Sequence, residues 1–323
     1  MLSVQTGFWR RVPQQCKRRL FARDFTIAID GPAASGKSST ARAVAQELGF
    51  GYIDSGSIYR CATLLALRQG IGAETDEHSQ KLVDLISNAA VDIRIKPNTR
   101  GPMPGVTGTG RLVVPDVQVL LDGEDVSKEI RTPEVNRLVA KVASDGGIRA
   151  AVLGIQRALA AAAETKPAST PGVATDKPAI PGGVVMDGRD IGTTVFPSAE
   201  LKIYLDASAM ARAIRRWDEL NSQLKEKEAD AAAARRQTAS DELAQDSANT
   251  ATPEPVGYPS VEDIARELEQ RDYADINRQH SPLRIAPDAV VIDNTNLTFE
   301  QQVFSITDLA RERMGLERKY DDI

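Results

Sequence analysis

A stretch near the N-terminus has the residue types and spacing of a loop that binds phosphate. Residues 25–40 read Phe-Thr-Ile-Ala-Ile-Asp-Gly-Pro-Ala-Ala-Ser-Gly-Lys-Ser-Ser-Thr, so an apolar run leads directly into G-x-x-x-x-G-K-S. Glycines let the backbone curl until successive N–H groups point at phosphate oxygens, and the following helix adds the positive end of its dipole. Lys37 is spaced to reach the β- and γ-phosphates of a nucleoside triphosphate, and the Ser38 hydroxyl to bind Mg²⁺.

The context of this loop matches the motif. A P-loop requires a strand before it and a helix after it, and a chance Gly/Ser-rich turn, the alternative interpretation, requires neither. We expect the chain to bind ATP together with Mg²⁺ as its cofactor. The predicted ATP-binding residues are Gly31, Pro32, Ala33, Ala34, Ser35, Gly36, Lys37, Ser38 and Ser39.

A second charged turn, Asp187-Gly-Arg-Asp-Ile-Gly-Thr193, follows the apolar run Val184-Val185-Met186. P-loop enzymes place an acid at the end of a neighbouring strand, where it orients Mg²⁺, often through water. Ser38 and Asp187 (through water) are therefore the predicted metal-binding residues. Arg189 and Asp190 are expected to project into the same crevice, with a structural salt bridge as the alternative.

Arginines at helical spacing could surround a phosphoryl group. Arg212, Arg215 and Arg216 are spaced i, i+3, i+4, which places them on one helix face, and Arg271 begins a second charged segment. On a mobile helical lid such side chains stabilise the charge of a migrating phosphoryl group. A solvated basic face is the alternative for either segment. The polar turn Asp54–Arg60 could hold a further phosphate, or could be an ordinary helix cap.

Short apolar runs must position these side chains. They are Thr26–Asp30, Tyr52–Asp54, Val184–Met186, Leu201–Leu205 and Val290–Asp293, and helical stretches separate them. This order predicts an α/β fold of the P-loop NTPase type, a parallel sheet flanked by helices, with ligands bound beyond the carboxyl ends of the strands. The alternating runs Val91–Ile95 and Arg111–Leu121 predict a small antiparallel hairpin inserted into the α/β core on the substrate side.

Composition shifts divide the chain. We expect a basic extension over residues 1–24, a P-loop domain over 25–300 and a C-terminal helix over 301–323. Within the domain we expect the inserted hairpin at about 85–135, flexible insertions at 161–183 and 225–260, and a lid over 208–280. The first 23 residues contain six basic residues and no acid, which is typical of a mitochondrial presequence, although Pro13 interrupts a long helix and an untargeted extension is equally compatible.

The bulk composition excludes several functions. The net charge is −5, which gives no basic field for nucleic acid, and no apolar run has the length of a membrane span. The two cysteines are too few for a disulfide framework, and no Cys/His cluster has zinc-ligand spacing. We expect a monomer that binds neither nucleic acid nor membrane, in the cytoplasm or the mitochondrial matrix.

Taken together, these segments resemble the bacterial-type cytidylate kinases, P-loop enzymes that phosphorylate CMP and dCMP. The resemblance rests on five ordered motifs between about residues 25 and 300, namely Ile29–Lys37, Asp54–Arg60, Gly123–Thr132, Asp187–Thr193 and Arg271–Arg278. It implies ATP-dependent formation of CDP and dCDP by a cytidylate kinase domain over 25–300, in which the insertion at about 85–135 binds the nucleoside monophosphate (NMP). The basic extension and the two flexible insertions depart from the family pattern and suggest a eukaryotic or organellar version.

The resemblance also implies roles for individual residues. The predicted CMP-binding residues are Ser55, Tyr59, Arg60, Arg189 and Arg278 for the monophosphate, Asp275 for the ribose, and Arg149 and Asp190 for the base. Cytosine offers an amino donor to a carboxylate and two acceptors to a guanidinium, whereas uracil mismatches both. Ala140 stands where the family commonly has a serine near the base, a departure that bears on selectivity. The predicted catalytic residues are Lys37, Arg212, Arg215, Arg216 and Arg271.

Other interpretations keep the P-loop and change the acceptor. The chain could phosphorylate UMP or a non-nucleotide metabolite such as shikimate, or bind nucleotide without catalysis. A regulatory GTPase is excluded because no D-x-x-G or N-K-x-D sequence occurs in the chain.

Overall fold

Five parallel strands form the centre of the protein. The structure is a computed structural model that describes residues 25–71, 76–96, 114–164, 182–222 and 259–316. The strand order is β2 (Gly51–Asp54), β6 (Gly183–Gly188), β1 (Phe25–Asp30), β7 (Leu201–Asp206) and β8 (Val290–Asp293). Every apolar run predicted as a strand of the parallel sheet lies in it, so the α/β prediction is confirmed.

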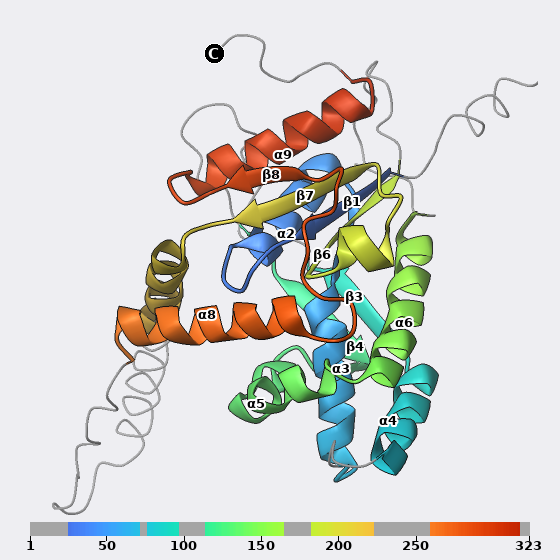
Figure 1. The fold of residues 1–323 in the computed structure, drawn as a ribbon. Helices are drawn as coiled ribbons and strands as arrows, with labels where there is room; N and C mark the ends of the chain where they lie inside the picture. Colours follow the sequence, from blue (N-terminus) through green and yellow to red (C-terminus); the bar gives the residue numbers. More distant parts are fainter. Residues whose placement is uncertain (1–24, 72–75, 97–113, 165–181, 223–258, 317–323) are drawn as a thin grey trace, which may run out of the picture.

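Helices cover both faces of this sheet because the side chains of β1 alternate between them. Ile27 and Ile29 pack with α2 (Lys37–Leu48) and α9 (Phe299–Arg313). Ala28 faces the other way, toward α3 (Ser55–Arg68) and α6 (Gly146–Glu164). In Figure 1, α9 lies above the sheet, and α3 and α6 extend below it. All six residues of β1 are buried, which fixes the strand that leads into the P-loop.

A small antiparallel sheet stands apart from the parallel one. It contains β3 (Val91–Ile95), β4 (Val117–Leu121) and β5 (Glu124–Asp125), and α4 (Asp76–Asn88) precedes it. Leu82 and Ile86 of α4 share a core with Val119 and Leu121 of β4. The predicted hairpin is confirmed as the antiparallel pair β3–β4, and β5 is an additional short strand. The 3₁₀ turn η2 (Glu129–Arg131) and α5 (Pro133–Val142) follow it.

Two helices form the predicted lid region. One spans residues 209–222, and the other is α8 (Val261–Asn277), which crosses the molecule below the P-loop in Figure 1. Ser260 begins α8 through a capping box with Asp263, in which each side chain binds the other residue's backbone N–H. An apolar cluster that includes Ala33, Ala213 and Leu268 joins both helices to the P-loop.

Several segment boundaries in the structure differ from those predicted from the sequence. Residues 161–164 belong to α6 and Gly183 begins β6, so the predicted insertion at 161–183 is regular structure at both ends. The predicted C-terminal helix begins at Phe299, ends at Arg313 and packs on α2 within the same core, so it is part of the kinase domain. The extension 1–24, most of the insertion 225–260 and residues 317–323 lie outside the described residues.

Gly31 is the first position at which this fold can be tested. Its φ is +153°, and a Cβ there would lie 2.1 Å from the carbonyl oxygen of Leu205. Gly31→Ala is expected to lower the free energy of unfolding by about 1–3 kcal/mol, because backbone must move. Gly154 in α6 has open space around it, and Gly154→Ala is expected to be neutral or stabilising by about 0.5–1 kcal/mol. Urea denaturation measures both, and equal stability of the two variants would contradict the geometry.

Candidate active site

The P-loop presents unpaired backbone N–H groups at the start of α2. Gly36 is the N-cap residue of this helix with a φ of +86°, and no side chain caps the first turn. Ala34 also adopts a left-handed conformation, with a φ of +57°. The uncapped helix start and its dipole suit an anion, as the motif predicts.

Lys37 lies buried within the loop that it follows. Its Nζ donates to the carbonyl oxygen of Pro32 at 2.7 Å. Burial holds the pKa of Lys37 well below its ordinary value, and the nearby Arg189 cation lowers this pKa further, while Asp187 opposes the shift. An anion bound in the loop would stabilise the charged form of Lys37.

Ser38 and Asp187 are adjacent, as the metal prediction requires. The Ser38 hydroxyl donates to one carboxylate oxygen of Asp187 at 2.6 Å, and the Tyr52 hydroxyl donates to the other at 2.8 Å. Burial, followed by the charge of Asp54, raises the pKa of Asp187 to about 6. These donors are all oxygens, which Mg²⁺ prefers. Among the described residues no group of three or more His, Cys, Asp or Glu side chains could hold a metal by itself.

Asp30, the acid that ends β1, anchors the turn after β6. Its two carboxylate oxygens accept from the backbone N–H groups of Ile191 and Gly192 at 2.8 and 2.7 Å. Burial raises the pKa of Asp30 to about 6, although both hydrogen bonds act in the opposite direction. Asp30 thereby fixes the turn that carries Arg189 and Asp190.

Arg149 and Asp190 form a buried ion pair at 2.5 Å, and each side chain is 6% exposed. The Arg149 guanidinium carbon lies 5.3 Å from the centre of the Tyr59 ring and Arg149 Nη1 donates to the carbonyl of Ala143. Arg149 Nε is buried with no hydrogen-bond partner among the described residues. The two predicted base-binding residues are thus held together, with one donor unused.

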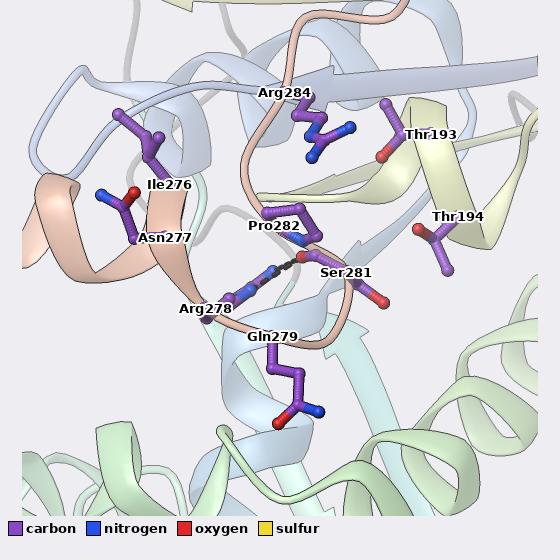
Figure 2. Close-up of a pocket in the computed structure, with 9 residues that line it drawn as sticks. All are labelled: Thr193, Thr194, Ile276, Asn277, Arg278, Gln279, Ser281, Pro282 and Arg284. Carbon is purple, nitrogen blue, oxygen red and sulfur yellow. Dashed lines mark hydrogen bonds between the residues drawn. The ribbon is translucent and has the colours of Figure 1, made fainter.

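The end of α8 completes this cluster. Asp275 accepts from Arg189 Nε at 2.9 Å, and Arg278 lies 3.5 Å from Asp275 and 3.6 Å from Asp190. Arg278 Nε also donates to the carbonyl of Ser281. Figure 2 shows Arg278 at the wall of an open pocket of about 490 Å³. The structure therefore brings Arg189 and Asp190 of the β6 turn together with Asp275 and Arg278 at the end of α8, four of the predicted CMP-binding residues.

Ser55 and Arg60 lie on α3 with their own partners. The buried amide of Gln156 donates to the Ser55 hydroxyl oxygen at 2.7 Å. Because this oxygen accepts from Gln156, the hydroxyl hydrogen of Ser55 remains available to a phosphate. Arg60 donates to the carbonyl of Ile130 at 3.1 Å and to the side chain of Asn136, contacts that hold it beside α5.

The arginines of helix 209–222 do not share one environment. Arg212 is buried and donates to Ala33, Ala207 and Asp272, whereas Arg215 donates to Asn294. Arg216 pairs with Glu219 on the surface. All three lie on a helix at the predicted spacing, but the P-loop and α8 both bind Arg212, the loop after β8 binds Arg215, and Arg216 pairs within its own helix. To reach a phosphate, Arg212 and Arg215 would have to exchange partners.

Unbalanced positive charge remains around the P-loop. Burial, followed by the charges of Arg189 and Arg271, lowers the pKa of Lys37. Partial desolvation by the surrounding protein, followed by Arg189, lowers the pKa of Arg271, although this residue reaches the surface. Burial and Arg271 also lower the pKa of Arg60. Arg271 has no hydrogen-bond or ion-pair partner among the described residues. Cations held this close to one another are suited to bind several phosphate groups at once.

The sequence patterns did not identify five residues that support the site. They are Tyr52, Gln156, Asp272, Asn294 and Gln302. Gln156 lies seven residues after Arg149, on the same face of α6, so helical spacing could have indicated it. Asn294, which donates to the carbonyl of Ser35 at 2.8 Å, has no such signal because its partners come from distant segments.

A phosphate-binding loop beside an arginine-rich acceptor pocket, both at the carboxyl edge of a parallel sheet, defines a P-loop kinase of the nucleoside monophosphate kinase type. The family model described as cytidylate kinase matches residues 27–166, 175–253 and 249–312. The chain belongs to the cytidylate kinase family.

Curated relatives agree with this assignment. A cytidylate kinase of Pelodictyon phaeoclathratiforme is 38% identical over 287 residues, which cover 89% of this chain and 95% of that protein. Cytidylate kinases of Geobacillus thermodenitrificans and Bacteroides fragilis are 35% and 34% identical, over 91% and 87% of this chain and 99% and 93% of those proteins. A solved structure of a putative kinase from Chloroflexus aurantiacus, with a TM-score of 0.29 and 11% identity, adds no support.

None of the helices among the described residues is both long and apolar enough to span a bilayer.

The Arg149–Asp190 pair provides a stability test of the acceptor cluster. Asp190→Asn leaves Arg149 and Arg278 as buried cations without this counter-ion, so the free energy of unfolding should fall by about 3 kcal/mol. Asp92→Asn removes the carboxylate of an exposed pair with Arg94 and should cost about 0–1 kcal/mol. Chemical denaturation compares them. A loss at Asp190 no larger than that at Asp92 would show that the pair is not buried in solution.

Proposed function

We propose that this protein transfers the γ-phosphoryl group of ATP to CMP and dCMP, giving ADP with CDP or dCDP. Family membership supports the reaction. The observation that carries the assignment of the acceptor is the buried Arg149–Asp190 pair next to Tyr59 and Arg278. A carboxylate and a guanidinium held together in this way match the donor and acceptor groups of cytosine.

ATP would bind through the P-loop. The backbone N–H groups at the start of α2 and the Lys37 ammonium would hold its β- and γ-phosphates. Ser38 and Asp187 (through water) would hold Mg²⁺, which contributes charge neutralisation on the phosphates when bound. Tyr52 already occupies one Asp187 oxygen, so it keeps this carboxylate oriented toward Ser38.

The acceptor phosphate would lie between Lys37 and the arginines of α3, the β6 turn and α8. Ser55 offers its hydroxyl hydrogen, while Arg60 and Arg189 offer guanidinium groups. An ionised phosphate oxygen of CMP attacks the γ-phosphorus, the bond to the β–γ bridging oxygen breaks, and ADP leaves with that oxygen's electron pair. The phosphate oxygen is already a competent nucleophile, so the reaction requires no catalytic base.

Lys37 and Arg271 are the cations we place on the migrating phosphoryl group. Lys37 is buried, which strengthens its interaction with charge that develops in the transition state, and Arg271 is an exposed cation whose charge acts on Lys37. Arg212, Arg215 and Arg216 remain proposed contributors that would first release their present partners. Closure of the lid would exclude water that otherwise hydrolyses ATP.

The expected partners of the chain are these nucleotides. The relatives named above are bacterial, so the mitochondrial alternative rests only on the composition of residues 1–24.

Turnover measurements test the assignment directly. ADP release with ATP and Mg²⁺ should be fast with CMP and dCMP, slower with UMP, and low with AMP or shikimate. Lys37→Met should lower turnover with CMP by at least about a hundredfold, the scale of a lost oxyanion-type contact. Near-wild-type turnover of that variant would refute the role of the P-loop lysine, and fast turnover with a different acceptor would reassign the substrate.

Gln156 tests how the acceptor phosphate is bound. Gln156→Met removes the donor to Ser55 and should raise the KM for CMP by roughly tenfold, since an unpaired buried polar group costs about 1–3 kcal/mol. Gln156→Glu should be worse, because its carboxylate accepts the Ser55 hydrogen and repels the phosphate. The KM for ATP serves as the internal control and should change less than twofold. Equal effects on both nucleotides would indicate a general loss of structure instead.

A further inference from the structure

Asp272 of α8 contacts the P-loop through one carboxylate oxygen and an arginine through the other. Oδ1 accepts from the backbone N–H of Ala33 at 2.9 Å, and Oδ2 accepts from Arg212 Nη1 at 2.6 Å. The residue is 8% exposed. Its two partners both donate, so a single carboxylate joins the P-loop to the helix of residues 209–222.

The Ala33 peptide is held from both sides. While its N–H donates to Asp272, its carbonyl accepts from Arg212 Nη1 at 2.8 Å, and Arg212 Nε donates to Ala207 at the start of the same helix. The buried side chains of Ile264 and Leu268 pack with Ala33 in the apolar cluster between α8 and the loop. A movement of the loop at Ala33 would therefore displace α8.

The same helix carries the acceptor residues. Asp275, three residues beyond Asp272, pairs with Arg189, and Arg278 follows beside Asp190. Six residues of α-helix span about 9 Å along the axis, so the contact with the donor loop and the contact with the acceptor pocket lie on one short rigid segment. Arg271, next to Asp272, lies among the cations around Lys37.

A purely structural role explains these contacts poorly. A buried ion pair often contributes no more stability than apolar side chains of the same size. The apolar cluster already joins α8 to the loop, yet Asp272 adds a contact to one peptide of the phosphate-binding backbone itself.

We propose that Asp272 is a positioning residue that couples the two substrate sites, so that donor nucleotide in the P-loop raises the affinity for CMP, and CMP raises the affinity for the donor nucleotide. The inference rests on the proposed function and adds a mechanism to it. Both nucleotides would favour the same placement of α8, one through Ala33 and the other through Asp275 and Arg278. Thermodynamic linkage requires the two enhancements to be equal.

Calorimetric titration of the full chain measures this coupling. CMP is titrated with Mg²⁺ alone and then with saturating non-hydrolysable ATP analogue and Mg²⁺, and the ratio of the two dissociation constants is the coupling factor. We expect a factor of about 5–150 for the unmodified protein. In Asp272→Asn the amide NH₂ must face one of the two donors, so one of the two contacts is lost. The coupling factor should then fall to between about 1 and about 2. Tyr273→Ala, at the adjacent and 72% exposed position, is the matched control and should retain the full factor.

The coupling factor separates positioning from general damage. A structural role would weaken CMP binding equally with and without the analogue, leaving the ratio unchanged, and this result would overturn the proposal. If Asp272→Asn does not fold, Leu268→Ala loosens the same contact without changing charge and should also lower the ratio. An unmodified protein that phosphorylates CMP but shows a factor of one refutes the coupling alone, whereas no ADP release with CMP refutes the proposed function.

Discussion

The parallel register of β1 with its two neighbours is the constraint on which the rest of this site depends. Ile29 and Asp30 lie opposite Asp187 and Gly188 of β6, and Asp30 also lies opposite Tyr204 of β7. β1 and β6 therefore end together and β7 ends two residues further on, so the P-loop, the Asp187 turn and the start of helix 209–222 emerge at one edge. A shift of one residue would reverse every side chain of β1 and separate Ser38 from Asp187. The pairing of the strands therefore sets the relative positions of Ser38 and Asp187 before any ligand binds.

The second constraint is electrostatic. The protein carries a net negative charge, yet burial, together with crowding by neighbouring arginines, lowers the pKa values of Lys37, Arg60 and Arg271. Such crowding costs folding free energy, which the carboxylates of Asp187 and Asp275 offset only in part. A protein retains an arrangement of this kind where anionic ligands complete it. Substrate phosphates are then the counter-ions that the folded chain lacks, so nucleotides should act as stabilising ligands as well as substrates.

The fold and the positions of the site were largely predictable from the sequence, since their signals are local. The G-x-x-x-x-G-K-S spacing, the apolar runs and the acids that end them all occur within a few residues. What could not be predicted is which partner each polar side chain chooses. Arg212 and Arg215 lie on one helix face by spacing. Arg212 nevertheless donates to the buried Ala33 carbonyl, whereas Arg215 donates to Asn294. Such choices depend on packing between segments 60 to 180 residues apart, which no periodicity encodes.

Helix 209–222 and α8 are each fastened to the P-loop, one through Arg212 and the other through Asp272. The chain that joins the two helices therefore begins and ends at anchored points. Lengthening a connection between fixed ends costs little, about 0.6 kcal/mol for each doubling. Evolution can consequently add or remove residues between positions 222 and 259 without moving Arg271 or Asp275. The two anchors, and not the connection between them, therefore set where Arg271 and Asp275 lie.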